Sequence, residues 1–399
     1  MKKRIFIEAH YLEIGGAEIS LIGLLNAIDY SRFDVDLFLY SHRGELMALI
    51  PEQVNLLPEI SEYAQMENPL IDVFRKGYLR QGLARLKAKI QYRFWAKKNN
   101  PQTPEAFFQY LDNAIMPSLP SLYRFGTYDM AINFIALKNH IPAKVKARKR
   151  ITWIHTDLTS VSVDPELELP AWDAYDHIIS ISPQVTSSFV KVFPSLMSKV
   201  IEIENIISPT FVRKRADAFN ADKELSSFGG NIRLLSIGRF CHAKNYDNVP
   251  DICRRLVESG IDVRWFIIGF GNDENLIRRK IAENGMEHHV ILLGKRSNPY
   301  PYIKACNIYL QPSRYEGKSV TVREAQILCK PVIVTNYATA SSQIQDKYDG
   351  IIVPLDNVGC ARGLVNCVHN NNLQKCIVEN LANTDFGNES EVEKLYKLL

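Results

Sequence analysis

The stretch from Tyr309 to Asn336 constrains the fold of this chain more than any other. Apolar residues 308–310 end in a polar loop that contains Glu316, a helical pattern with Glu324 follows, and a second apolar run begins at Val332. This order predicts two parallel strands joined by a helix, as in open α/β sheets. Such sheets bind ligands at the carboxyl ends of their strands, which is where the polar loop stands.

The two glutamates of this stretch are eight residues apart. Because Glu is almost never buried without a partner, we expect that Glu316 and Glu324 do not both belong to the core. We interpret them as groups that grip a polyhydroxylated ligand.

Strand and helix patterns alternate along the whole chain, which predicts an α/β class with two Rossmann-like parallel sheets. A chain of 399 residues is also too long for one ordinary core. The polar, turn-rich residues 205–231 mark the boundary between the domains. We therefore place an N-terminal domain at residues 1–205, a C-terminal domain at 206–385, and a separate short helix at 386–399.

The predicted strands are short apolar runs bounded by turn residues. In the first half they are Arg4–Ala9, Val35–Tyr40, Met130–Phe134, Ile151–His155 and His177–Ile181. In the second half they are Ile232–Ile237, Val263–Ile268, Val290–Leu293, Ile308–Gln311, Pro331–Thr335 and Gly350–Val353.

The composition, with 46% hydrophobic and 23% charged residues, is that of an ordinary globular protein. No uninterrupted run of about 18 apolar residues occurs, so no transmembrane helix is expected. The apolar stretch after Met1–Arg4 is too short for a signal peptide and is interpreted as the first strand. Seven scattered cysteines without a CxxC pair favour reduced thiols over disulfides or a zinc site. These features predict a cytoplasmic protein.

Residues 71–100 differ from their surroundings because no acidic residue occurs between Asp72 and Glu105, whereas nine residues there are basic. Apolar residues recur at spacings of three and four, which predicts a basic amphipathic helix. Such helices bind anionic membrane surfaces. The alternative is a surface helix that packs its apolar stripe onto its own domain. Nucleic-acid binding is not expected, since no nucleic-acid fold signature accompanies the helix.

Two glycine loops carry groups that suit phosphate binding. Gly15 and Gly16 follow the first predicted strand and precede a helix, where glycine permits close backbone approach and a helix N-terminus attracts anions. Gly238, Arg239 and Lys244 follow the first strand of the second domain, and two cations at a glycine turn can neutralise a diphosphate. A simple turn and a solvated loop are the respective alternatives.

His155 stands at the end of a predicted strand. A lone histidine there is more often structural than catalytic, but its position at a strand end makes a ligand role plausible. Metal-ligand spacings such as HExxH are absent from the sequence. The adjacent His288 and His289 point in different directions on any regular element, so they make poor joint ligands. No metal is expected.

Together these motifs resemble the retaining, nucleotide-sugar-dependent glycosyltransferases of family 4, which have the GT-B fold. The matching segments follow one another in order over most of the chain: GGAE at 15–18, WIHTD at 153–157, ENIIS at 204–208, GRFCHAKN at 238–245, IIGFG at 267–271, and SRYEGKSVTVREAQILCKPVIVTN at 313–336. The resemblance implies two Rossmann-like domains that face each other across a cleft. It also implies a closing helix, at 386–399, that returns to the acceptor-side N-terminal domain, and no metal or other cofactor.

The resemblance assigns roles to residues of the second domain. It implies that Arg239 and Lys244, at the Gly238 turn, hold the donor diphosphate, that Glu316 contacts hydroxyls of the donor sugar, and that Glu324 binds the ribose.

Other donor contacts follow from the same resemblance. Backbone amides near Ser319 and Val320 would meet phosphate, and Gly317 and Lys318 belong to the same loop. Many family members have an apolar residue where this chain has Lys318. From the first domain, Gly16 would approach the diphosphate, and His155 would approach the transferred sugar.

We therefore expect a hexosyltransferase (class EC 2.4) that moves a sugar from a nucleotide-diphosphate donor to a hydroxyl acceptor with retention of anomeric configuration. Arg239, Lys244 and helix-end amides would stabilise the leaving group without a covalent intermediate. The expected partners are the nucleotide sugar, a glycan or lipid-linked acceptor of polysaccharide biosynthesis, and, through residues 71–100, the anionic inner face of a membrane.

Two alternatives stay open. One is a non-catalytic nucleotide-sugar-binding or scaffolding protein of the same fold. The other is a dinucleotide-dependent oxidoreductase, against which the absence of GxGxxG after the first strand counts.

Overall fold

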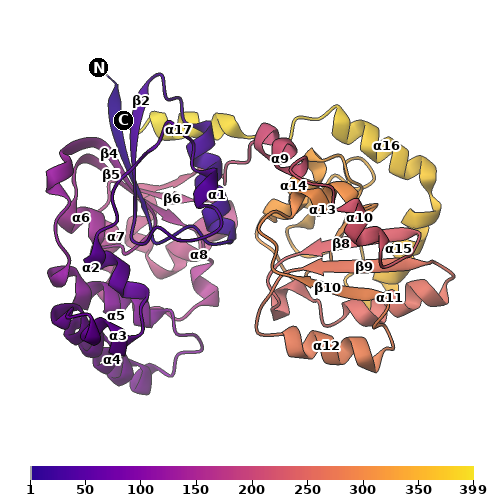
Figure 1. The fold of residues 1–399 in the computed structure, drawn as a ribbon, viewed down its shortest axis with the longest axis horizontal. Helices are drawn as coiled ribbons and strands as arrows, with labels where there is room; N and C mark the ends of the chain where they lie inside the picture. The colour runs from indigo at the N-terminus through magenta and orange to yellow at the C-terminus, as the bar shows by residue number, and fades with distance from the viewer. Residues whose placement is uncertain (1) are drawn as a thin grey trace. The chain divides into compact units, whose positions relative to one another are not determined.

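The computed structural model describes residues 2–399, apart from the side chains of Glu67 and Ser160. The chain divides into two compact units (Figure 1). The first comprises the residues up to Ile206 together with Glu389–Leu399, and the second comprises Ile207–Asn388. Each unit is built on one parallel sheet with helices on its faces, which confirms the predicted pair of α/β domains.

The first unit contains a seven-stranded sheet in the order β3-β2-β1-β4-β5-β6-β7. All neighbouring strands are parallel. The chain builds outward from β1 to β3 and then returns to add β4 on the other side of β1. Loops at the carboxyl ends of β1 and β4 therefore part in opposite directions, which leaves room for a ligand. The strands are β1 (Lys3–Ala9), β2 (Phe33–Leu39), β3 (Asn55–Leu56), β4 (Thr127–Ile135), β5 (Lys146–Ile154), β6 (His177–Ser180) and β7 (Val200–Glu202).

The helices of the first unit are α1 (Gly16–Ala27), α2 (Ser61–Ala64), α3 (Leu70–Arg75), α4 (Leu79–Asn99), α5 (Ala106–Ile115), α6 (His140–Lys144), α7 (Pro165–Asp173), α8 (Pro183–Val192) and, near the chain end, α17 (Val392–Tyr396). On one face of the sheet, Phe6 and Phe38 share a core with Tyr63 of α2, Ala88 of α4 and Ile115 of α5. Helix α4 enters this core through the small residue Ala88 and packs mainly against α5.

A single helix was predicted over residues 71–100, but the structure has two helices there, α3 and α4. The chain turns between α3 and α4 at Gly77, whose φ of +83° is a conformation that glycine adopts without strain. The basic residues fall mainly on α4.

The second unit contains a six-stranded parallel sheet in the order β10-β9-β8-β11-β12-β13. Alternate residues of its strands enter two cores: Leu234 and Leu310 face one, whereas Leu235 and Tyr309 face the other. A sheet buried on both faces explains why its strands read as continuous apolar runs. The strands are β8 (Ile232–Ile237), β9 (Val263–Ile268), β10 (Val290–Gly294), β11 (Ile308–Gln311), β12 (Val332–Thr335) and β13 (Ile351–Val353).

The segment 205–231, interpreted as a turn-rich boundary, begins where the two units meet and then contains two short helices of the second unit. The helices of this unit are α9 (Pro209–Ala216), α10 (Asp222–Ser226), α11 (Val249–Glu258), α12 (Glu274–Glu283), α13 (Tyr300–Ala305), α14 (Val320–Ile327), α15 (Asn357–His369) and α16 (Asn371–Ala382). Ser208 caps α9 by accepting a hydrogen bond from the Phe211 N–H, and Val212 and Ala216 are buried. With so few apolar residues on its buried side, α9 has a weak sequence pattern.

The residues from Glu389 onward pack on the first unit. The Tyr396 hydroxyl accepts a hydrogen bond of 2.7 Å from the Asp29 N–H, and its ring stacks on Phe33 with 4.4 Å between centroids. The regular helix, α17, is shorter than the predicted segment 386–399, and Phe386–Asn388 belong to the second unit. Within the described residues, no helix combines the length and apolar character needed to cross a bilayer.

Candidate functional site

The best-formed polar cluster lies where β8 and β11 end, in the middle of the second unit's sheet. The strand order reverses there, because β9 lies on one side of β8 and β11 on the other. The β8 loop carries Gly238 and Arg239 and a short turn, η7 (His242–Lys244), while the β11 loop carries Ser313 and Glu316. This is the position at which open α/β sheets bind ligands.

Lys244 and Glu316 form a short ion pair, with 2.6 Å between Nζ and Oε1. The same carboxylate oxygen accepts hydrogen bonds from Ser313 Oγ at 2.5 Å and from Gln311 Nε2 at 3.0 Å. In the described part of the chain, no hydrogen bond reaches Glu316 Oε2. The side chains of Lys244 and Glu316 are 19% and 12% exposed, so the pair is shielded from water yet open on one side. One carboxylate oxygen is fixed, and the other is left to a ligand.

Hydrogen bonds from β11, β12 and the loop after β12 support the Glu316 loop. Tyr309 donates to Gln311 Oε1 at 2.8 Å, and Gln311 Nε2 donates to Ser313 Oγ at 2.8 Å. Thr335 Oγ1 donates to the Ser313 carbonyl at 2.6 Å, and Thr339 Oγ1 donates to the Glu316 carbonyl at 2.8 Å. Such supporting bonds fix the orientation of a binding group before the ligand arrives.

These supporting residues were missed in the sequence. A usable signal existed only for Gln311, a polar residue that ends an otherwise apolar strand and is fully buried. Thr335 stands at the end of β12, and Thr339 follows it in the next loop. Nothing in the spacing of either threonine indicates a bond to the Glu316 loop.

Gly238 makes room for Lys244. A Cβ atom added to Gly238 would lie 3.0 Å from Lys244 Cε and 2.9 Å from the Tyr246 hydroxyl, both closer than ordinary contacts. Asn245, at a φ of +61°, donates from Nδ2 to the Pro312 carbonyl at 2.9 Å. The β8 loop is thus tied to the β11 loop, and the lysine chain lies over the glycine.

A second tie joins the same two loops. The Arg314 guanidinium binds both carboxylate oxygens of Asp247, at 2.9 and 2.7 Å, and also donates to the His242 carbonyl at 2.7 Å. Arg239, by contrast, is exposed and makes no ion pair among the described residues. The structure therefore brings Lys244 and Glu316 together and leaves the Arg239 side chain in solvent.

Glu324 lies in the core, on α14, whereas Glu316 is half-buried, so the two glutamates do not both belong to the core, as expected. Its Oε1 accepts a hydrogen bond of 2.7 Å from the Tyr300 hydroxyl, which supplies the partner that a buried carboxyl needs. Burial raises the pKa of Glu324 to about 7, because water no longer stabilises the charged form. In the described part of the chain, no hydrogen bond or ion pair joins it to Lys244 or Glu316.

The N-terminus of α14 lies next to the Glu316 loop in sequence and has no side-chain cap. The Ser319 N–H, expected to meet phosphate, donates instead to Gln343 Oε1 at 3.1 Å, and Gln343 Nε2 donates back to the Ser319 carbonyl. Val320 begins the helix, so its amide belongs to the first turn that lacks intrahelical partners. Gly317 is exposed with open space around its Cα, and Lys318 is half-buried.

The glycines that follow β1 differ from each other. Gly15 is the N-cap residue of α1, in an extended conformation, and a Cβ atom there would collide with the Glu18 carboxylate. Gly16 is exposed, with nothing within 4 Å of the position of a Cβ atom. The contact at Gly15 involves only the end of the flexible Glu18 side chain, and Gly16 is open to an approaching ligand.

His155 follows β5 and is half-buried in the first unit. Nε2 lies 3.1 Å from the Phe134 carbonyl, so this nitrogen carries the proton, and Nδ1 is left without a hydrogen-bond partner. Burial lowers the pKa of His155 to about 3, so the ring is neutral at pH 7. A neutral Nδ1 is a hydrogen-bond acceptor.

His155 lines a cavity of about 290 Å³ inside the first unit, beside the ends of β1, β4 and β5. Asp112 and Trp153 also line it, and Asp112 Oδ1 and Trp153 Nε1 are buried without partners. Burial raises the pKa of Asp112 to about 7 and lowers the pKa of Lys138, whose ammonium lies 4.3 Å from the centre of the Trp172 ring. Buried polar atoms without protein partners indicate a site for water or a polar ligand.

Of the cavity residues, only His155 was singled out in the sequence. The others come from α5, α7 and the ends of β4 and β5, and from the loops after β1, β4 and β5, so no local pattern connects them. Elsewhere in the described chain, no group of three or more His, Cys, Asp or Glu side chains gathers as ligands for a metal ion.

Comparisons with known proteins find a family model that matches most of the second unit. Residues 217–382 match the model described as glycosyl transferases group 1. An uncharacterized glycosyltransferase of Methanocaldococcus jannaschii, MJ1069, is 26% identical over 224 residues, which cover 52% of this chain and 53% of that protein. The Campylobacter jejuni N-acetylgalactosamine-N,N'-diacetylbacillosaminyl-diphospho-undecaprenol 4-alpha-N-acetylgalactosaminyltransferase is 28% identical over 144 residues, or 36% and 39% of the two chains. The chain thus spans about half or less of the length of these curated relatives.

The whole chain resembles solved structures in its fold. The crystal structure of Anabaena Alr3699/HepE in complex with UDP-glucose superimposes with a TM-score of 0.65 at 13% identity, covering 99% of both chains. At this identity the likeness concerns the fold alone. The second unit therefore contains a glycosyl transferases group 1 domain, and the chain has the GT-B fold.

Proposed function

We propose that this protein is a retaining hexosyltransferase that moves a sugar from a nucleotide-diphosphate donor to a hydroxyl of a lipid-linked glycan. The observation that carries the proposal is the Lys244–Glu316 pair at the switch point of the second unit's sheet, with Glu316 Oε2 left open. The group 1 domain match supports a sugar transfer, and the Campylobacter relative, named for an undecaprenol-linked acceptor, supports the acceptor class.

Lys244 acts on the leaving group. When the bond between the sugar and the diphosphate breaks, negative charge grows on the phosphate oxygens, and a cation already in place stabilises it without reorganisation. The ammonium of Lys244 has three N–H donors, of which Glu316 uses one. The exposed Arg239 and the uncapped first turn of α14 supply further positive ends in the same unit.

Glu316 orients the donor sugar. Its Oε1 is held by Lys244, Ser313 and Gln311, so its Oε2 is an acceptor in a fixed position for sugar hydroxyls. A carboxylate that shares its charge with an ammonium and a hydroxyl is also a poor nucleophile. This favours retention without a covalent glycosyl intermediate, in which the acceptor attacks from the face that the leaving group departs.

The cavity of the first unit suits hydroxyl-bearing rings. His155 Nδ1 accepts a hydrogen bond from a sugar hydroxyl that enters this cavity, while Asp112 Oδ1 and Trp153 Nε1–H bind the acceptor glycan. A sugar hydroxyl both donates and accepts, so it matches a site that offers both kinds of group.

The test is a transfer assay with purified protein, a panel of nucleotide-diphosphate sugars and a prenyl-diphosphate-linked glycan. We expect one donor to be consumed with an α-linked product from an α-linked donor, as read by NMR of the anomeric proton. Glu316→Ala should lower kcat/KM at least a hundredfold. Lys375→Ala, at an exposed position of the same unit, is the matched control and should keep full activity.

Three outcomes would contradict the proposal. Inversion of the anomeric centre would exclude retention. Donor binding without turnover on any acceptor would favour a non-catalytic binding protein. Unchanged activity in Glu316→Ala would remove the assigned site.

A further inference from the structure

Helix α4 presents a row of apolar side chains to solvent. The row consists of Leu79, Leu83, Leu86, Ile90 and Phe94, and between 41% and 74% of each residue is exposed. At about 100° per residue, the five lie within about 80° of the helix circumference. Single exposed apolar residues are ordinary on protein surfaces, but a contiguous row marks an interaction site.

The opposite side of α4 holds the helix on its own unit. Gln81 and Ala88 are buried there, and Gln81 Nε2 donates to the Ser118 carbonyl at 3.1 Å. A Cβ atom on Gly82 would collide with the Phe74 ring, so α3 packs closely against α4 at this point. The alternative that the apolar stripe packs onto its own domain is therefore wrong.

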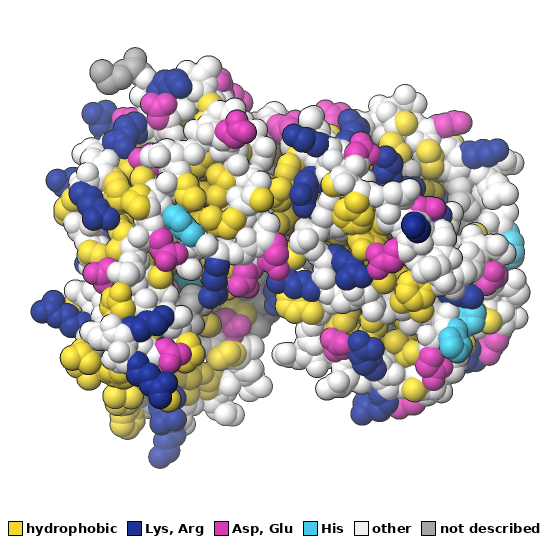
Figure 2. All heavy atoms as spheres, in the orientation of Figure 1, with side chains coloured by type: hydrophobic (Ala, Val, Ile, Leu, Met, Phe, Trp, Pro, Cys, Tyr) yellow, Lys and Arg dark blue, Asp and Glu magenta, His cyan; other side chains and the backbone are white. Residues whose placement is uncertain are grey.

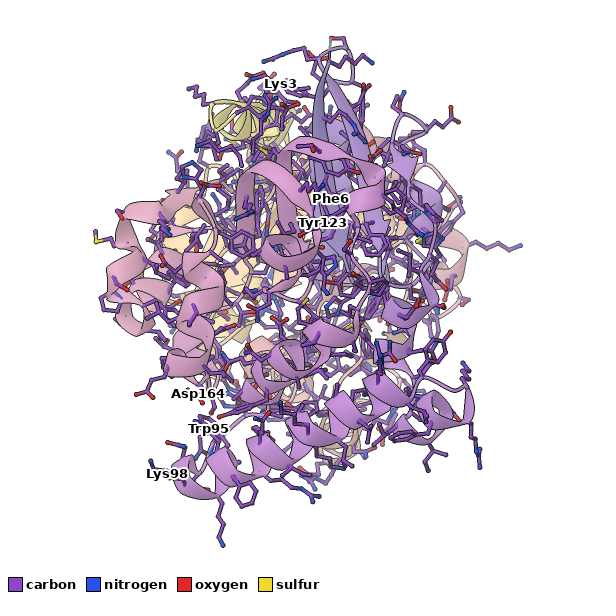
Figure 3. All side chains as sticks on the ribbon, turned by 90° about the vertical axis from the view of Figure 1, so that its left-hand side faces the viewer. Lys3, Phe6, Trp95, Lys98, Tyr123 and Asp164 are labelled. Atoms are coloured by element: carbon purple, nitrogen blue, oxygen red, sulfur yellow. The ribbon has the colours of Figure 1, made fainter. Side chains whose placement is uncertain are left out.

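Two aromatic residues of α4, Tyr92 and Trp95, face inward, unlike Phe94 of the exposed row. Tyr92 and Trp95 each lie 6.3 Å from Tyr110 of α5, measured between ring centroids. Figure 3 shows α4 along the lower edge of the unit, with Trp95 and Lys98 near its end. Arg85 is likewise an inner residue, since Nη1 donates to the carbonyls of Gln65 and Asn68.

Cations flank the apolar row on both sides. At the same helical spacing, Arg80, Lys87 and Lys98 follow one flank, and Lys89 and Arg93 follow the other. All five are exposed, and none forms an ion pair in the described part of the chain. Figure 2 shows hydrophobic and basic side chains side by side over this helix, at the lower left.

We propose that this face of α4 docks on an anionic phospholipid bilayer, with the helix axis parallel to the surface. The apolar row enters the boundary between headgroups and acyl chains, and the flanking cations reach the lipid phosphates. A helix of 21 residues is about 30 Å long, so all five apolar residues meet the surface at once. The helix lies on the membrane, because α4 is not apolar enough to cross one.

Charge favours this occupant over two others. A second copy of the chain docked through the same row would bring cationic flanks against cationic flanks, which is unfavourable. Nucleic acid would satisfy the cations but would leave exposed leucines unburied along the centre of the face. Only an anionic, apolar surface satisfies both the row and its flanks.

The experiment measures sedimentation of the full chain with vesicles, without nucleotide sugar, so its result does not depend on the proposed function. Vesicles of phosphatidylethanolamine with a third of phosphatidylglycerol are compared with pure phosphatidylcholine. We expect binding to the anionic vesicles alone, weakened by salt. Replacing Lys87, Lys89 and Arg93 by Gln should weaken it about a hundredfold, at about fivefold for each cation.

A second variant tests the apolar row. Replacing Leu83, Ile90 and Phe94 by Ser should weaken vesicle binding at least a hundredfold and leave the melting temperature unchanged, because all three are exposed. The matched controls carry three Ser at exposed Met197, Leu355 and Val358, or three Gln at exposed Lys223, Arg362 and Lys375. Both controls should bind as the wild type does.

The proposal is overturned if wild type does not sediment with anionic vesicles, or if it binds phosphatidylcholine equally well. It is also overturned if the serine variant of the row binds normally, or if analytical ultracentrifugation shows a dimer that this variant dissociates.

Discussion

In both units, polar groups lie at the carboxyl ends of the parallel strands, but the units differ in whether these groups have hydrogen-bond partners. At the ends of β8 and β11, the polar groups bind one another: Glu316 Oε1 alone accepts hydrogen bonds from Lys244, Ser313 and Gln311. Beside the ends of β4 and β5, His155 Nδ1 and Trp153 Nε1 are buried without partners. The first arrangement is organised in advance, as a site that stabilises developing charge must be. The second is completed only by what fills the cavity.

The largest expected effect is the loss of transfer activity when one group of the second unit's cluster, Lys244, is removed. Lys244→Ala should reduce transfer about a thousandfold in kcat, because it removes the leaving-group cation and leaves Glu316 uncompensated. Steady-state kinetics at saturating donor measures the effect. Lys244→Arg keeps the charge and should recover part of the activity. Full activity in Lys244→Ala would show that the pair is only structural.

Each unit also holds one buried carboxyl whose pKa is raised to about 7, Glu324 in the second and Asp112 in the first, from ordinary values of 4.5 and 3.8. Since folding raises both pKa values, the folded protein binds more protons, and this contribution to stability is full below about pH 4 and is lost as pH rises through 7. The contribution is up to about 3 kcal/mol for Glu324 and up to about 4 kcal/mol for Asp112.

We therefore expect the melting temperature to fall between pH 5 and pH 8 by about 5 °C more in wild type than in Glu324→Gln or in Asp112→Asn. Scanning calorimetry at a series of pH values measures the slopes. Water or a ligand in the cavity of the first unit would solvate Asp112 and reduce the shift of its pKa. The pH dependence of the melting temperature should then change less in Asp112→Asn than in Glu324→Gln. Parallel slopes in wild type and both variants would contradict the raised pKa values.

A similar contrast separates the features that the sequence predicted from those that it did not. The bounds of β8, β9 and β11 agree with the prediction, because each is a compact apolar run in a sheet buried on both faces. Lys244 and Glu316 each belong to a local motif after such a strand, so both were singled out in the sequence.

The rest depends on packing that no local pattern records. Asp112 and Trp153 meet at the cavity from α5 and β5, and nothing in the sequence joins them. For α4, the apolar spacing was plain, but the side that faces the protein was not. Its buried side uses Gln81 and Ala88, which periodicity reads as weakly polar or neutral.

The cavity can be tested by deleting one donor. Trp153→Phe removes Nε1–H and keeps an aromatic ring against Phe134, which lies 4.9 Å away between centroids. We expect the KM for the acceptor to rise about tenfold, because one hydrogen bond to a buried group is lost, while the KM for the donor stays constant. A rise in the donor KM alone would move the acceptor site away from this cavity.

The smallest expected effect on kcat concerns Thr339, which supports the Glu316 loop. Thr339→Val removes the hydroxyl that donates to the Glu316 carbonyl and keeps the branched shape. We expect kcat to fall about fivefold, because the loop loses one of the bonds that fix Glu316 and the lost bond is worth about 1 kcal/mol. Thr339→Ser should restore the bond and the rate. A Thr339→Val variant with unchanged kcat but a lower melting temperature would show that the bond stabilises the loop without positioning the carboxylate. The contrast between a pre-organised second unit and an open first unit would then rest on the Lys244, Ser313 and Gln311 bonds alone.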